Sequence, residues 1–382
     1  MITLKEMITK KEMKQFVMFP FSIYKNNPYW VPPIITEELE TLNKDKNPAF
    51  ENAEARFFVA IKNNKIVGRI ATIINWYEVK EQQIKKMRFG WYDVIDDIEV
   101  SRVLIQKVEE IGKKNDLTYM EGPVGFSNLD KVGVLIEGFN HIGTMVTWYS
   151  LPHYKVHLEN LSFTKEKEYL ENSFQLEKVN APYYKRVSNL IKHRFKLRSL
   201  NFTKTRDILP FVTEMFDLFN KSYAKLSSYV PISDNQIEYF KKKYISFINP
   251  EFIKFVMDEN NKLVAFGIMM PSFSEALQKA NGKLFPFGFY HLLKAKNNAK
   301  TVTSYLIGVD PAYQNKGITA IIFSDFTTSF NAIGVKNVIR TPELEDNTAI
   351  HQLWKNFDPK THKKKNNVQE KHLNLNFKYH NF

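Results

Sequence analysis

The sequence has 382 residues, enough for two domains that each bury a core of their own. Apolar residues make up 43% of it, which excludes wholesale disorder, and the lack of cysteine excludes disulfides, thiolate metal sites and cysteine nucleophiles. The formal charge of +13 would suit a polyanion. Because the lysines are scattered along the chain, nucleic acid is not favoured as a partner, and a polyphosphate-bearing cofactor would be drawn to the same field.

The N-terminus, residues 1–12, is charged and lacks the apolar core of a signal peptide. No apolar run approaches the ~20 residues of a membrane helix. We therefore expect a cytoplasmic protein with no membrane span. The densest basic run, from His362 to Lys365, lies in a polar stretch and is predicted to be a loop.

The first half is predicted to contain a hairpin, a central strand, a helix and a further strand. An aromatic and proline-rich opening includes a short helix at 16–24. Strands at 57–61 and 66–74 flank Asn63 and Asn64, a pair suited to a tight turn. The remaining elements are a strand at 87–93, a helix that starts at an acidic cap at 96–99 and ends near Asn115, and a strand at 117–121.

The second half is predicted to repeat this order. Helices at 182–192, 207–223 and 233–244 and a strand at 195–202 precede a hairpin at 252–257 and 263–270. An insertion at 271–300, a strand at 302–309, a helix after residue 318 and a strand at 337–341 follow. The shared order supports an internal duplication, with an N-terminal domain at 1–175 and a C-terminal domain at 176–382. Two unrelated α+β domains are the alternative.

The segment 301–320 combines a buried strand, a proline turn, a polar loop and a helix start. Pro311 cannot continue a sheet ladder, and apolar residues recur at helical spacing after the loop. The free amides and the dipole of a helix N-terminus suit a phosphate. Gly317 would let the backbone approach such a ligand, and Lys316 adds a positive charge.

Residues 309–319 resemble the acyl-CoA-binding signature of the GNAT superfamily of N-acyltransferases. Gln314 and Gly317 match that signature, whereas Thr319 departs from its last small position. The resemblance implies acyl-CoA, in the first instance acetyl-CoA, as co-substrate, with no metal. The residues expected at the cofactor are Leu306, Ile307, Gly308, Val309, Gln314, Asn315, Lys316, Gly317, Ile318, Thr319 and Asn347.

Two further departures concern catalysis. The family often has a tyrosine about seven residues after the asparagine that approaches the pantetheine, and Trp354 stands there. Many members also hold a glutamate on the signature strand, where this chain offers Ser304 and Tyr305. Tyr305 is the candidate catalytic residue. A backbone amide around Ile307 to Val309 would hold the oxyanion of the intermediate.

The corresponding loop of the first half, residues 93–99, has four carboxylates and no glycine. Like charges a few ångströms apart repel by about 1 kcal/mol or more even near the surface, so this loop would repel a pyrophosphate. The sequence therefore predicts a single cofactor site, in the C-terminal domain, and an N-terminal domain that lacks the CoA loop.

Segments at 122–127, 134–139 and 284–288 narrow the resemblance to a group of uncharacterised bacterial tandem GNAT-like proteins. It implies an α+β fold of two tandem GNAT-like domains, each with a mixed, mostly antiparallel sheet flanked by helices. In that likeness the segment 154–170 closes the first domain.

Two other constellations have competing interpretations. His153 and His157 are spaced for a shared metal ion, but only Glu159 is near as a third ligand, so we expect surface histidines on a helix. The aromatic set Phe285, Phe287, Phe289 and Tyr290 could line a substrate pocket, and core packing is the preferred interpretation.

The sequence thus predicts an acyl-CoA-dependent N-acyltransferase acting on a small-molecule or peptide amine. One alternative is an inactive CoA-binding or interaction protein that keeps the fold. Others are a tandem aminoacyl or long-chain acyl transferase and a basic nucleic-acid-binding protein. The acceptor, the acyl chain, the oligomeric state and the pathway are not encoded in any motif.

Overall fold

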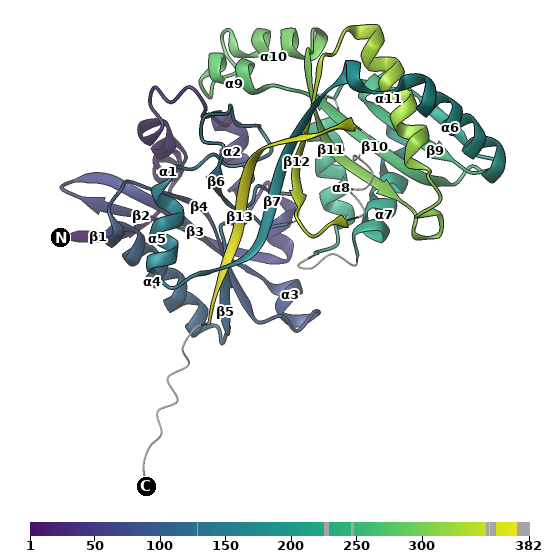
Figure 1. The fold of residues 1–382 in the computed structure, drawn as a ribbon. Coiled ribbons are helices and arrows are strands. Elements are labelled where there is room, and N and C mark those ends of the chain that lie inside the picture. Colours follow the sequence, from purple (N-terminus) through teal and green to yellow (C-terminus); the bar gives the residue numbers. More distant parts are fainter. Residues whose placement is uncertain (128, 225–228, 246–247, 349–350, 352–356, 373–382) are drawn as a thin grey trace. The chain divides into compact units, whose positions relative to one another are not determined.

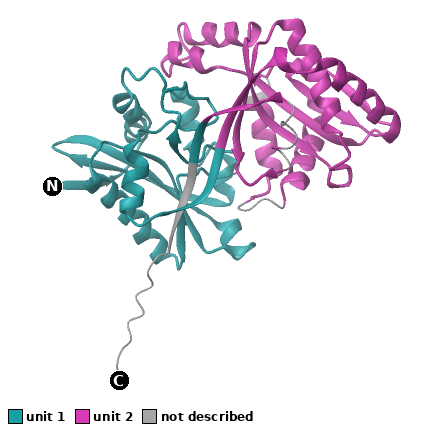
Figure 2. Ribbon diagram, in the orientation of Figure 1, with its two compact units in different colours: residues 1–169, 363–382 teal, residues 170–362 magenta. Residues whose placement is uncertain are grey.

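The computed structural model describes residues 1–127, 129–224, 229–245, 248–348, 351 and 357–372 (Figure 1). The chain forms two compact units, unit 1 from residues 1–169 and 363–382 and unit 2 from residues 170–362 (Figure 2). The unit boundaries fall within two long strands, β7 (Thr164–Gln175) and β13 (Lys360–His372). The predicted domain division at 175 and 176 stays a prediction.

Unit 1 is built on a mixed sheet whose strands follow one another in chain order. They are β1 (Ile2–Glu6), β2 (Ala53–Lys62), β3 (Lys65–Asn75), β4 (Lys86–Val94) and β5 (Tyr119–Glu121). Neighbours are antiparallel except β4 and β5, which are parallel and are connected through α4 (Ile98–Lys114). The predicted hairpin is confirmed, because Asn63 and Asn64 have φ angles of 52° and 59°, as a tight turn requires.

Strands β2 and β3 are buried on both faces, which explains why each reads as a nearly continuous apolar run. Phe58 and Ile70 lie in a core cluster with apolar residues of α4. Phe57 and Ala71 point the other way, into a cluster with residues of α1 (Lys10–Ile23) and α2 (Ile35–Thr41). The sheet of unit 1 therefore has helices on both faces.

Unit 2 repeats the same sheet. Its strands are β8 (Arg198–Asn201), β9 (Ile253–Met257), β10 (Leu263–Pro271), β11 (Thr301–Val309) and β12 (Asn337–Leu344). They are antiparallel except β11 and β12, which are parallel and connected through α11 (Thr319–Ile333). The predicted α+β fold with two mixed, mostly antiparallel sheets is confirmed, and the shared strand order supports a duplication.

The remaining elements lie between these strands. They are α3 (Trp76–Lys80), β6 (Val134–Glu137), α5 (His153–Asn160), α6 (Ala181–Phe195), α7 (Val212–Tyr223), α8 (Asp234–Phe240), α9 (Ser274–Ala280) and α10 (Gly288–Asn297). In the part of the chain that the structure describes, no helix has the length and apolar character needed to cross a bilayer.

The prediction of a loop at residues 362–365 is wrong, because this run belongs to β13. Lys363 and Lys365 are 2% and 3% exposed, and their ammonium groups donate to the carbonyls of Ile142 and Trp148. Lys364 points the other way and pairs with Glu137 at 3.2 Å. The alternation of a strand, which composition alone hides, buries every second lysine here.

This alternation gives a matched pair of substitutions. Lys365→Ala leaves the buried carbonyl of Trp148 without its ammonium donor and should lower the free energy of unfolding by about 1–3 kcal/mol. Lys364→Ala should change it by less than about 0.5 kcal/mol, because its ion pair is exposed. Urea unfolding of both variants measures the difference, and equal effects would contradict the inward orientation of Lys365.

Candidate functional site

In unit 2 the parallel strands β11 and β12 are paired over only part of their length. Thr301–Ser304 pair with Asn337–Arg340, whereas β11 continues to Val309 and β12 to Leu344. On its other edge, β11 stays paired with β10 as far as Val309. The two strands therefore part after Ser304 and Arg340.

The pairing with β10 determines which way the peptide groups of β11 point. The N–H of Asp310 donates to the carbonyl of Val264 next to β10, at 2.8 Å. Because alternate residues of a strand direct their N–H and C=O groups to opposite edges, those of Ile307 and Val309 point away from β10. This is the edge from which β12 has departed.

A β-bulge marks the same point of β11. Ile268 pairs with Leu306 and Met269 with Ser304, so Tyr305 is the extra residue. Bulges re-aim nearby groups and are common beside active sites. Tyr305, the predicted catalytic candidate, is thus the bulged residue at the point where β11 and β12 part. No sequence motif indicated this bulge.

Two hydroxyls of α7 bind carbonyls of this run of β11. The Tyr223 hydroxyl donates to the carbonyl of Ile307, and Ser222 Oγ donates to that of Val309, both at 3.1 Å. Burial raises the pKa of Tyr223 to about 12, so its hydroxyl is a proton donor at neutral pH. Sequence patterns predict only a helix here, because neither residue belongs to a recognised motif.

The loop after β11 is held by Asp310. Its carboxylate accepts the N–H of Ala312 at 2.9 Å and pairs with Lys262 at 3.1 Å. Burial opposes ionisation of this group, but the bond from Ala312 and the Lys262 ammonium prevail and lower the pKa of Asp310. Gln314 folds back and donates from Nε2 to the carbonyl of Val309 at 3.2 Å.

The helix that follows this loop starts without a side-chain cap. Ile318, at the N-cap of α11, makes no side-chain hydrogen bond and is buried, so its side chain anchors the helix start. Gly317 has a φ of 75°, and a Cβ there would meet Ile191 Cδ1 at 2.9 Å. The Lys316 ammonium lies over the rings of Phe195 and Tyr313. An exposed, uncapped helix start beside a cation fits a phosphate group.

The other predicted cofactor residues divide into three groups. Asn315 has a φ of 59° in the loop, and Thr319 is the first residue of α11. Gly308 lies opposite Phe266, whose ring would be 2.3 Å from a Cβ at residue 308, so its missing side chain serves packing. Asn347 lies in the turn after β12, where its N–H donates to the carbonyl of Leu344. Trp354 lies outside the described residues.

A buried polar cluster follows the parting on β12. Glu343 accepts hydrogen bonds from Arg340 at 2.6 Å and from Asn172 at 3.2 Å. Burial raises the pKa of Glu343, although Arg340 opposes the shift. Thr361 in turn donates to Asn172 at 2.6 Å. Sequence reasoning missed Glu343, because a single glutamate on a short strand carries no signal of its own.

The corresponding helix start in unit 1 is closed by the chain itself. Asp97 is the N-cap of α4, and its carboxylate accepts the N–H of Glu99 at 3.1 Å. The hydrogen bond from Lys62 lowers the pKa of Asp97, with an Nζ–Oδ2 distance of 2.7 Å. An ionised carboxylate thus occupies the place that α11 leaves open.

Side chains pack around the part of β4 that precedes α4. Asp93 pairs with Arg69 at 2.7 Å and accepts a hydrogen bond from Tyr24 at 2.9 Å. Tyr154 donates to the same carboxylate at 3.3 Å. Burial and the charge of Asp93 raise the pKa of both tyrosines well above the usual range. The adjoining cavity, which Trp148 helps to line, has room for about one water molecule.

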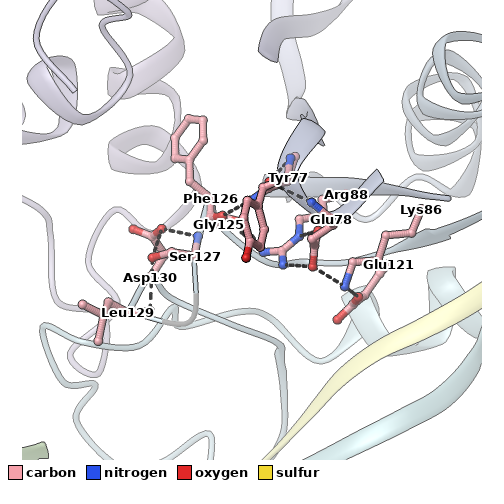
Figure 3. Close-up of polar contacts among 11 residues, drawn as sticks. Tyr77, Glu78, Lys86, Arg88, Glu121, Gly125, Phe126, Ser127, Leu129 and Asp130 are labelled. Carbon is pink, nitrogen blue, oxygen red and sulfur yellow. Dashed lines mark hydrogen bonds and ion pairs between the residues drawn. The ribbon is translucent and has the colours of Figure 1, made fainter. Parts of the chain in front are cut away.

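A second buried cluster of unit 1 lies at the start of β4 (Figure 3). Lys86 pairs with Glu78 at 2.8 Å and with Glu121 at 2.7 Å. Arg88 lies between Glu78, with an Nε–Oε2 distance of 2.8 Å, and the carbonyl of Gly125 at 3.1 Å. Two cations and two carboxylates balance, so this cluster fixes the loop after β5 and is not a catalytic acid–base pair.

The two histidines of α5 have structural partners. His157 is buried, not on the surface as expected, and contacts Ser101 Oγ at 2.8 Å and Asp96 at 3.1 Å. His153 contacts the carbonyl of Val94 at 3.0 Å. Among the described residues no group of three or more His, Asp or Glu side chains could hold a metal ion.

The prediction that the aromatic set of the insertion packs in the core is wrong. Phe285, Phe287, Phe289 and Tyr290 are all exposed. Leu292 of α10 is buried instead. Hydrophobicity alone predicted burial, but the insertion is too short to enclose more than one face of its helices.

Comparisons with known proteins give partial matches in sequence and matches over nearly the full length in structure. No family model matches the chain. It is 32% identical over 158 residues to protein YghO of Escherichia coli strain K12, a match covering 41% of this chain and 40% of that protein. It is 29% identical over 133 residues to a bacterial ceramide synthase of Caulobacter vibrioides, covering 35% of each. The matches thus span about two fifths or less of these relatives.

Among solved structures, a tandem GNAT protein from the clavulanic acid biosynthesis pathway superposes with a TM-score of 0.57. The superposition covers 98% of this chain and 99% of that protein, at 9% identity. The chain has the tandem GNAT fold. At 9% identity the likeness shows the fold alone. Within this fold, unit 2 contains the uncapped start of α11 and the parted strands β11 and β12.

Tyr223→Phe removes a half-buried hydroxyl whose pKa is raised. Its pKa is about 12 in the folded protein and about 10 when unfolded, so the folded state holds the proton more tightly. This stabilisation is complete below about pH 10 and is lost as the pH rises towards 12. The parent should therefore lose stability faster than the variant, by up to about 1.4 kcal/mol per pH unit. Urea unfolding at about pH 9, 10 and 11 measures this difference, and parallel curves would contradict it.

Proposed function

We propose that unit 2 binds an acyl-CoA, with acetyl-CoA as the first donor to test, and transfers the acyl group to an amine. The observation that carries this proposal is the uncapped start of α11, which follows a strand whose outer edge is free of β12. The loop before α11 matches the acyl-CoA signature at Gln314 and Gly317 and lies on a tandem GNAT fold, which supports the same conclusion.

Different residues around α11 and β11 would bind different parts of the cofactor. The amides of the loop from Gln314 to Thr319 and the Lys316 ammonium would hold the pyrophosphate. The run from Leu306 to Val309 would lie along the pantetheine, with Asn347 near that arm. In this arrangement an N–H of Ile307 or Val309 would stabilise the oxyanion that forms when the amine attacks the thioester.

Proton transfer needs two further groups. The attacking amine must be neutral, so its ammonium form has to lose a proton. Glu343 is our candidate acceptor, because burial raises its pKa towards the working pH. Tyr305, at the bulge, is the candidate donor to the leaving thiolate. Tyr223 would position Ile307 through its hydrogen bond to that carbonyl.

Gly317→Asp should weaken CoA binding at least about tenfold, because it places a side chain and a negative charge at the phosphate position. Gly334→Asp is the matched control: it has a φ of 77° against 75° and caps the other end of α11. Titration calorimetry with CoA measures both. Equal CoA affinity of the Gly317 variant and the parent would remove the proposed cofactor site.

Glu343→Gln should lower kcat at least about tenfold and leave the affinity for acetyl-CoA unchanged, because the carboxamide cannot accept the proton. Tyr305→Phe should also lower kcat, because a phenyl ring cannot donate a proton to the leaving thiolate. A screen of amines with acetyl-CoA identifies the substrate for these assays. Tight CoA binding without turnover on any amine would support the inactive, fold-retaining alternative instead.

A long-chain acyl donor is the second candidate. The relative of Caulobacter vibrioides is a ceramide synthase by name, and ceramide is an amide of a long-chain acid. Parallel assays with acetyl-CoA and palmitoyl-CoA on the same amines separate the two donors. Faster transfer from palmitoyl-CoA would assign this chain to the long-chain class.

A further inference from the structure

The insertion between β10 and β11 presents large apolar side chains to solvent. Phe285 and Phe287 are 75% and 73% exposed, and Phe289, Tyr290 and Leu293 are 43–59% exposed. These five residues, which we call the aromatic patch, lie within nine consecutive positions on and just before α10. Contiguous exposed patches of this kind mark interaction surfaces on soluble proteins.

The exposure follows from how α10 packs. The helix rests on α9, with which it lies side by side in Figure 1, and it buries Gly288 and Leu292. A Cβ at residue 288 would lie 1.9 Å from the carbonyl of Lys283, so the helix start is tightly fixed against the preceding loop. Burial of Leu292 turns Phe289 and Leu293 outward, and the rings of Phe285 and Phe289 contact each other at 5.7 Å.

The charged side chains that flank the aromatic patch in the sequence are all lysines. Residues 279–300 contain no aspartate or glutamate, and their lysines are Lys279, Lys283, Lys294, Lys296 and Lys300. Lys283 and Lys294 are exposed and flank the patch in the sequence. The net charge of the whole chain is +13, so the protein as a whole is positively charged as well.

We propose that the aromatic patch docks on an anionic phospholipid bilayer. Phenylalanine, tyrosine and leucine side chains enter the boundary between headgroups and acyl chains, while flanking lysines bind the negative lipid headgroups. Lysines beside an apolar patch complement a bilayer that carries many negative headgroups. An apolar protein surface would need a separate carboxylate for each lysine, so charge complementarity favours the bilayer. Docking of this kind attaches the protein to one membrane face and inserts no spanning segment.

The proposal is tested by co-sedimentation of the full chain with phosphatidylcholine vesicles that contain or lack phosphatidylglycerol. We expect binding to the vesicles with phosphatidylglycerol, which weakens as salt rises because the headgroup charges are screened. Phe285→Ser combined with Phe287→Ser should lower the partition coefficient at least about tenfold, through loss of buried apolar area. Lys283→Glu combined with Lys294→Glu should weaken binding to anionic vesicles.

Leu190→Ser is the matched control, because Leu190 is 63% exposed on α6 and lies outside the patch. It should bind vesicles as the parent does, and circular dichroism confirms that every variant is folded. Absence of parental binding, or equal binding of the double phenylalanine variant, would overturn the proposal. So would a dimer in light scattering that the phenylalanine substitutions dissociate, since the patch would then be an interface between two copies of the chain.

Acyl transfer gives an independent readout. The double phenylalanine variant should transfer acyl groups to a water-soluble amine at the parental rate, since the aromatic patch is not part of the proposed catalytic site. Failure of vesicle binding would therefore leave the proposed function standing. Failure of CoA binding would equally leave the membrane proposal standing.

Discussion

The constraint on which the functional site depends is the parting of two parallel strands. β11 and β12 pair for four residues and then separate, while β10 holds β11 in place on its other edge. A strand paired on one edge and released on the other presents a row of peptide groups at the released edge. The bulge at Tyr305 falls at the point along β11 where this edge is released, and the hydroxyls of Tyr223 and Ser222 bind the carbonyls of Ile307 and Val309 beyond it.

Unit 1 has the same strand geometry, but different side chains lie at the corresponding place. Its parallel strands pair over Lys86–Arg88 and Tyr119–Glu121, and a register shift of β4 opposite Ile70 corresponds to the bulge of β11. There, however, Asp93 and its tyrosine partners fill the released edge, and Asp97 caps the helix start. The Asp97 carboxylate, whose pKa the hydrogen bond from Lys62 lowers, opposes a polyphosphate by charge, and the side chains around Asp93 leave room for about one water molecule. The two units thus share one strand order, and the placement of charged side chains distinguishes them.

Much of the fold could be predicted from the sequence because its signals are local. The asparagine turn at residues 63 and 64, the acidic cap of α4 and the glycine loop before α11 each depend on neighbours in the chain. Predictions failed where the decisive partner is distant. The buried lysines of β13 are satisfied by carbonyls more than two hundred residues away, and the aromatic residues of the insertion are exposed because α10 buries Gly288 and Leu292 instead.

By itself, the sequence determined the order of elements, the turns and helix starts, and the segment that resembles an acyl-CoA loop. Propensity, capping and hydrophobic period act over a few residues, which is why these features can be read along the chain. Only the tertiary structure decided where β11 and β12 part, which carbonyls Tyr223 and Ser222 bind, and that Glu343 lies half-buried beside Arg340. Those facts depend on register and burial, which arise when strands distant in sequence meet.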